Sequence, residues 1–150
     1  MQTRLFLSGW GLRCKVVTTE TQRHRDESRI NSITGAIIDC SIRVHKELGP
    51  GLLESVYEVC LMKELISEGL SVKRQLSLPV VYKGEKIDID FKIDLLVEDE
   101  VIVELKAVES ILPVHEAQIL TYLKLSGMKI GLLLNFNTKL LKDGIRRFVL

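Results

Sequence analysis

The sequence predicts an α/β domain in which helices flank a mixed β-sheet. Apolar residues recur about every 3.6 positions before residue 70 and again over residues 114–125, which indicates amphipathic helices. Between residues 76 and 93 the period falls to 2, which indicates strands. A chain of 150 residues with 46% hydrophobic side chains fits one domain of ordinary size.

Two helices are expected to open the domain. Apolar spacing over residues 30–48 predicts the first, which ends at the Gly-Pro-Gly turn of residues 49–51 because proline cannot continue the hydrogen-bond ladder. The second is expected from about residue 53 to residue 67, with Gly69 as its stop. Its inward-facing residues are predicted to be Val56, Cys60 and Leu61.

Strands and a third helix follow. Alternation over residues 76–82 and 87–93, with Lys83-Gly84 between them, predicts a hairpin whose first strand is an edge because it contains Pro79. A third strand is expected over residues 101–107. A helix over residues 114–125 follows Pro113 and ends near Gly127, after which residues 130–136 form a buried strand and residues 144–149 a last edge strand.

The domain is expected to cover residues 30–150, preceded by a poorly ordered extension over residues 1–29. Within it, residues 20–29 are polar and fit a linker or a helix lead-in. No apolar run reaches the roughly 18 residues of a membrane-spanning helix. Three cysteines (Cys14, Cys40 and Cys60) lack the spacing of disulfide or zinc pairs, which favours the reducing cytoplasm, with Cys40 and Cys60 as buried thiols.

Charge is unevenly distributed although the net charge is only +1. Residues 85–109 carry nine acids against three lysines, whereas the chain from Lys129 onward carries five basic residues against one acid. Carboxylates beside basic surface suit a metal-dependent enzyme acting on a phosphate polymer. Ordinary solvated charge explains the same pattern equally well.

One strand carries the polar residues of greatest interest. Glu104 and Lys106 alternate with apolar neighbours and therefore project from the same face. Charged groups are costly to bury there unless they are paired or bind a ligand. Asp94 lies on the preceding strand, and a short turn between the strands is expected to bring it near Glu104. Two carboxylates could then bind a hard divalent cation. A purely structural ion pair between Glu104 and Lys106 is the alternative.

Asp94, followed after nine residues by Glu104-Leu105-Lys106, resembles the D…ExK core of the PD-(D/E)xK nuclease superfamily. The segment GLLESVY at residues 51–57 resembles the signature of the bacterial GxxExxY protein family. This resemblance extends from near Ile30 to the C-terminus. One departure is Ile93, which stands where the superfamily name has proline, a position that is often substituted.

The resemblance implies a PD-(D/E)xK nuclease-like core and a set of site residues. Asp94, Glu104 and Glu54 are expected to bind Mg²⁺ or Mn²⁺, with Asp94, Glu104 and Lys106 as the catalytic set. Substrate-binding or supporting roles are implied for Tyr57, His115, Gln118 and Tyr122. Simpler explanations stay open: a dipole contact for Glu54, a core-edge position for Tyr57, a helix cap for His115 and a surface pair for Gln118 with Tyr122.

The function expected from these residues is divalent-metal-dependent hydrolysis of phosphodiester bonds in nucleic acid, with DNA preferred over RNA on superfamily precedent alone. The alternative is a non-catalytic module on a nuclease fold that binds nucleic acid or a protein partner. A homodimer would suit a cutter of two strands. No membrane partner is expected.

Overall fold

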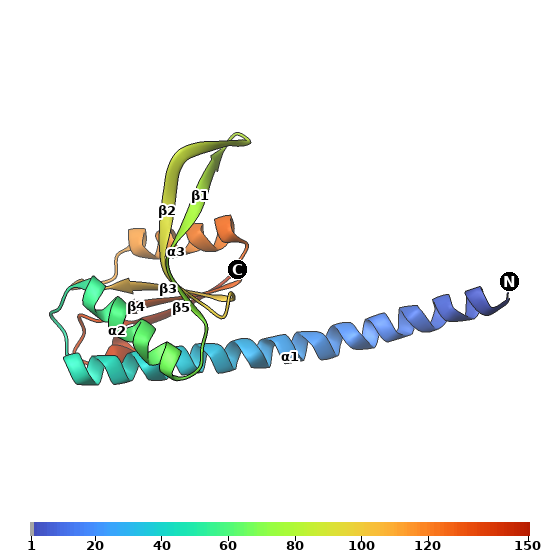
Figure 1. Ribbon diagram of the computed structural model, residues 1–150, viewed down its shortest axis with the longest axis horizontal. Coiled ribbons are helices and arrows are strands. Elements are labelled where there is room, and N and C mark those ends of the chain that lie inside the picture. Colours follow the sequence, from blue (N-terminus) through green and yellow to red (C-terminus); the bar gives the residue numbers. More distant parts are fainter. Residues whose placement is uncertain (1) are drawn as a thin grey trace. The chain divides into compact units, whose positions relative to one another are not determined.

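A computed structural model describes the backbone of residues 2–150 and the side chains of residues 19–150. The elements follow in the order α1, α2, β1, β2, β3, α3, β4, a short 3₁₀ turn η1 (Leu141–Gly144) and β5 (Figure 1). The chain divides into two compact units, residues 1–32 and residues 33–150. The expectation of poor order falls partly on residues 1–18, which lie outside the described side chains. Cys14 lies among these residues.

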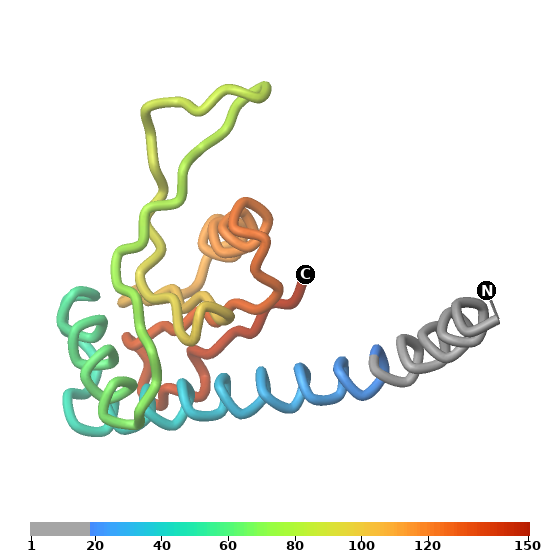
Figure 2. Tube along the Cα trace, turned by 45° about the vertical axis from the view of Figure 1, so that its right-hand side comes forward, coloured from blue at the N-terminus to red at the C-terminus, as the bar shows by residue number. Residues whose placement is uncertain are grey.

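Helix α1 (Gln2–Leu48) ends at the predicted residue but does not begin at Ile30. Residues 19–29 continue the helix (Figure 2). Their side chains are all exposed. Of the two interpretations of residues 20–29, linker or helix lead-in, the structure confirms the helix. Hydrophobic periodicity could not reveal this segment because a helix without a buried face has no apolar stripe.

Helix α2 (Glu54–Ser67) begins within one residue of its predicted start, and Gly69 follows it with a φ of 83°. Its predicted inward face was partly wrong. Val56 is exposed and Cys60 is half-buried, whereas the buried residues are Tyr57, Glu58, Leu61 and Leu65. Residues 57, 61 and 65 recur every four positions, so they form a continuous stripe along the helix.

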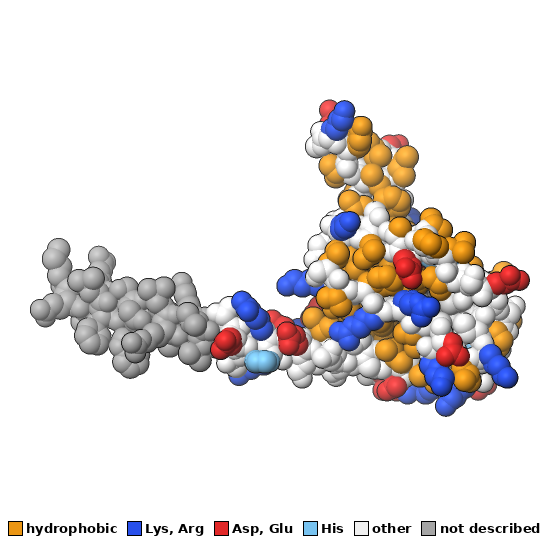
Figure 3. Space-filling view, turned by 180° about the vertical axis from the view of Figure 1, so that it is seen from behind, with side chains coloured by type: hydrophobic (Ala, Val, Ile, Leu, Met, Phe, Trp, Pro, Cys, Tyr) orange, Lys and Arg blue, Asp and Glu red, His pale blue; other side chains and the backbone are white. Residues whose placement is uncertain are grey.

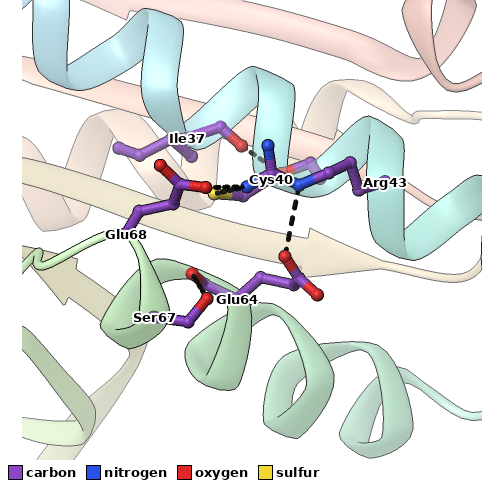
Figure 4. Close-up of polar contacts among 7 residues, drawn as sticks. Ile37, Cys40, Arg43, Glu64, Ser67 and Glu68 are labelled. Carbon is purple, nitrogen blue, oxygen red and sulfur yellow. Dashed lines mark hydrogen bonds and ion pairs between the residues drawn. The ribbon is translucent and has the colours of Figure 1, made fainter.

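A cluster of polar groups joins residues 40–43 of α1 to the end of α2 (Figure 4). The Arg43 guanidinium donates through Nε to Glu64 Oε2 at 3.2 Å and through Nη2 to Glu68 Oε1 at 2.6 Å. Nη2 also lies 3.2 Å from Cys40 Sγ. Burial raises the pKa of the Cys40 thiol, so this cysteine stays protonated and unreactive. The cluster therefore serves helix packing.

Five strands form one mixed sheet in sequence order: β1 (Val72–Tyr82), β2 (Glu85–Val97), β3 (Val101–Lys106), β4 (Ile130–Asn135) and β5 (Ile145–Val149). Neighbours are antiparallel except β3 and β4, which are parallel because α3 (Pro113–Ser126) connects them. The predicted hairpin turn, both edge strands and the stop of α3 at Gly127, where φ is 74°, are confirmed.

Helices cover both faces of the sheet, as the sequence predicted. Figures 1 and 2 show α3 on one side and α2, with residues 33–48 of α1, on the other. Residues 101–105 of β3 and 130–136 around β4 are all buried, so these strands form the centre of the core. Ile119, Tyr122 and Leu123 of α3 pack in one cluster with Ile102 and Leu133.

The β1–β2 hairpin projects beyond the rest of the sheet. Only Leu95–Val97 of β2 pair with β3, and the two strands of the hairpin continue past that point paired to each other. Hydrophobic side chains lie on the surface of the projecting part (Figure 3), among them Val81, Tyr82 and Ile89. Asp94 directly precedes the last β2 residue that pairs with β3, so it lies where the two strands separate.

Within the described part of the chain, no helix has the length and apolarity needed to cross a membrane.

Candidate functional site

The site forms where β2 separates from β3. Their last pair is Leu95 with Val103, and one further step of the same register sets Asp94 opposite Glu104. Instead of a further strand pair, the Leu105 amide N–H donates to Asp94 Oδ2 at 2.9 Å. The side chain of Asp94 thus takes the place of the backbone acceptor, which fixes it beside the D…ExK strand.

Glu104 is the most constrained group of the site. Only 3% of its surface is exposed, Lys106 Nζ lies 3.4 Å from its Oε1, and its buried Oε2 has no hydrogen-bond partner among the described residues. Burial, and after it the charge of Asp94, raise the pKa of Glu104 to about 8, against the opposing effect of Lys106. An unpartnered buried carboxylate oxygen is costly to the folded state and typically needs an explanation such as a bound ligand.

The pKa of the Asp94 carboxyl is also raised. Burial raises its pKa, the Leu105 N–H opposes the rise, and the charge of Glu58 adds to it. Perturbed carboxyl groups gathered at one place are typical of functional sites.

The two carboxyl groups at this site suit a cation that is coordinated by few protein side chains. Mg²⁺ commonly binds through one or two carboxylates and keeps several waters, which Asp94 and the free oxygen of Glu104 can satisfy. Among residues 19–150, no three His, Cys, Asp or Glu side chains gather into a fuller metal-binding set. Glu54, exposed at the start of α2, is near enough for its charge to raise the pKa of Glu104, but it does not complete such a set.

Helix α3 brings two further predicted residues to this region. The Gln118 side-chain amide donates to the Tyr122 hydroxyl at 2.7 Å, and Tyr122 is buried. Burial raises the pKa of Tyr122, the Gln118 hydrogen bond lowers it, and the charges of Glu104 and Asp94 raise it. The pair is therefore a hydrogen-bonded unit within electrostatic reach of both carboxylates.

Two other predicted residues have partners elsewhere. Tyr57 is fully buried and stacks on Phe136 with ring centroids 4.5 Å apart. Its hydroxyl donates to the Gly49 carbonyl at 2.6 Å and accepts from the Leu52 N–H at 3.1 Å, which holds the turn before α2. His115 Nδ1 accepts from the Leu112 N–H at 3.0 Å and so caps the start of α3.

Sequence reasoning missed a chain of three contacting residues, Arg74, Glu58 and Gln75, of which Gln75 contacts Asp94. Gln75 Nε2 donates to Asp94 Oδ1 at 3.3 Å and to Glu58 Oε2 at 2.8 Å. The other oxygen of Glu58 forms an ion pair with Arg74. Glu58 could have been found as a glutamate next to the buried stripe of α2. The prediction that Val56 faces inward assigned the wrong face of α2 to the core, so Glu58 was not considered.

A mixed sheet flanked by helices, with Asp94 on β2 beside Glu104 and Lys106 at the end of β3, fits a PD-(D/E)XK nuclease-like core. Residues 31–148 match the PD-(D/E)XK nuclease superfamily, and the chain belongs to it. No curated protein and no solved structure matches the chain.

Proposed function

We propose that this protein is a divalent-metal-dependent nuclease that hydrolyses phosphodiester bonds, with DNA as the preferred substrate. The observation that supports it most directly is Glu104, buried with one oxygen unpartnered beside Asp94 and Lys106. Membership of the nuclease superfamily supports nucleic acid as the substrate class. The preference for DNA over RNA comes from superfamily precedent.

Asp94 and Glu104 would bind Mg²⁺ or Mn²⁺, with Glu54 as a third, more distant acid. Such an ion supplies Lewis-acid polarisation of the phosphate and a bound water of lowered pKa. Lys106 is only 14% exposed at its side chain, so its positive charge acts in a region of reduced screening. There it can stabilise the negative charge that develops on the phosphate or orient the attacking water.

The remaining predicted residues have supporting roles in this proposal. Gln118 and Tyr122 would contact the substrate or orient the carboxylates from α3. Tyr57 and His115 would hold the turn before α2 and the start of α3, through the contacts described above. We also propose that the chain is a member of the GxxExxY family within the superfamily, on the basis of residues 51–57.

The test is cleavage of labelled single- and double-stranded DNA and RNA with Mg²⁺ or Mn²⁺ by the wild type, Lys106→Ala and Lys63→Ala. Lys63 is exposed on α2 and is a matched control for loss of one lysine. We expect Lys106→Ala to lose at least about 100-fold in rate, because a charge directed at the transition state is removed. Full activity of Lys106→Ala would disprove the assignment. Salt-sensitive binding without cleavage under either ion would favour the non-catalytic binding module instead.

A further inference from the structure

The side-chain amide of Gln75 is shared by two carboxylates from different elements. Its nitrogen donates to Glu58 on α2 and to Asp94 on β2, over the 2.8 and 3.3 Å given above. A primary amide has two N–H donors and no charge, so it can join two anions without neutralising either. Glu58 is itself buried and is held at its other oxygen by Arg74.

The backbone at Gln75 departs from ordinary strand geometry. Four described non-glycine residues have positive φ, and three of them lie in the turns that follow β1 and β2 (Lys83, Glu98 and Asp99). Gln75 alone lies within a strand, with a φ of 51°. The pairs on either side, Arg74 with Leu95 and Leu76 with Ile93, keep one register, yet no pair forms between Gln75 and Asp94. Such strain persists only where the surroundings impose it, and it gathers at functional sites.

A purely structural link between β1 and α2 does not account for the contacts and the positive φ of Gln75. The Arg74–Glu58 ion pair already links those two elements. Gln75 adds a contact to Asp94, whose second oxygen is held by the Leu105 N–H. Each oxygen of Asp94 therefore accepts one hydrogen bond, and a carboxylate oxygen has a second lone pair for a cation.

We propose that Gln75, anchored by Glu58 and Arg74, is a positioning residue that holds Asp94 in the orientation that binds the divalent ion. This inference rests on the proposed metal-dependent function. It assigns a role to a residue outside the D…ExK set and explains its left-handed backbone. Groups that orient a metal ligand typically change metal affinity about 10–100-fold when they are removed.

The experiment compares the wild type with Gln75→Ala, Gln75→Gly and Lys73→Ala. Glycine removes the same amide as alanine and tolerates a φ of 51°, so it separates loss of the amide from backbone strain. Lys73 is the matched control, because it also lies on β1 and its loss breaks a 2.6 Å ion pair, to Asp99 rather than to Asp94. Mn²⁺ affinity is measured by calorimetry, and the Leu105 amide is followed by NMR without metal.

We expect both Gln75 variants to bind Mn²⁺ about 10–100-fold more weakly than the wild type. Their Leu105 amide resonance should shift without metal, because its acceptor Asp94 moves. Lys73→Ala should match the wild type in both measurements. A readout at Leu105 does not depend on an active enzyme.

Two results would overturn the inference: wild-type affinity in both Gln75 variants, or a weakened Gln75→Ala beside a normal Gln75→Gly, which would indicate strain rather than the amide. If the wild type does not bind Mn²⁺, the proposed function fails, and the Leu105 amide then decides the positioning role. A shift in both Gln75 variants supports it, and an unchanged resonance refutes it.

Discussion

At the scale of one residue, the pKa of Glu104 determines how the proposed cation site responds to pH. With a pKa of about 8, this side chain carries a proton at neutral pH when no metal is bound. An ion that binds through the carboxylate must displace that proton. We therefore expect Mn²⁺ binding at about pH 7 to release about one proton. Calorimetry in two buffers of different ionisation enthalpy measures the release, and a heat that does not depend on the buffer would contradict it.

The same pKa predicts how stability depends on pH. The pKa of Glu104 is about 8 in the folded protein against an ordinary value of 4.5, so the folded state binds the proton more tightly than the unfolded state. Its contribution to the free energy of unfolding is full below pH 4.5 and is lost as the pH rises through about 8. Glu104→Gln keeps a neutral side chain at every pH. Urea unfolding without metal should therefore show Glu104→Gln gaining stability relative to the wild type over that range, and a constant difference would refute the prediction.

Tyr57 offers a test that separates a supporting role from substrate contact. Tyr57→Phe keeps the stacking on Phe136 and removes the hydroxyl that bridges Gly49 and Leu52. We expect a loss of about 1 kcal/mol in the free energy of unfolding, because the two hydrogen bonds are lost and the partly buried Gly49 carbonyl loses its donor. Cleavage per folded molecule should change little. A large loss of activity at unchanged stability would instead place the hydroxyl against the substrate.

At the scale of elements, the close contact of α3 with β4 requires that residue 131 be a glycine. A Cβ at Gly131 would lie 2.9 Å from Ile119 Cδ1 and 3.3 Å from Leu123 Cδ1. We expect Gly131→Ala to destabilise the protein by about 1–3 kcal/mol through overpacking. Ile119→Val removes the nearest atom, so the double variant should be more stable than the sum of the two single changes predicts. Strictly additive unfolding free energies would show that the contact is not the cause.

Most elements could be predicted from the sequence because each had a local signal. The Lys83-Gly84 turn and Gly127 after α3 mark element boundaries, and Pro79 marks an edge strand, by backbone chemistry alone. The orientation of α2 could not be predicted, since Val56 and Tyr57 both suit a buried face. Tertiary contacts select Tyr57, through its stacking on Phe136 and the hydrogen bonds of its hydroxyl.

The residues of the site also divide into those that a local sequence pattern predicts and those that depend on tertiary contacts. Glu104 and Lys106 could be predicted because alternation along one strand places them on the same face. Gln75 could not, because its contact with Asp94 depends on a positive φ within a strand and on the register between β1 and β2. No sequence pattern reports either property.

At the scale of the whole domain, the site results from an incomplete sheet. β3 is paired along its full length with β4, but with β2 only through Leu95–Val97. Beyond that point the β1–β2 hairpin departs, and Asp94 and Glu104 lie where the two strands separate. A fully paired β2 would satisfy the Leu105 N–H with a backbone carbonyl and leave Asp94 no role in the ladder.

This arrangement lies within residues 33–150, which form one compact unit. The described side chains before it, residues 19–29, are exposed, so their removal uncovers little apolar surface. We therefore expect a chain of residues 30–150 to unfold cooperatively, with a Tm within a few degrees of that of the full protein, and to keep its Mn²⁺ affinity. Thermal unfolding by circular dichroism and calorimetric titration measure the two quantities. A truncated chain that keeps its Tm but loses Mn²⁺ binding would show that residues 1–29 contribute to the site, whereas a broad transition of low Tm would show that they are part of the folded domain.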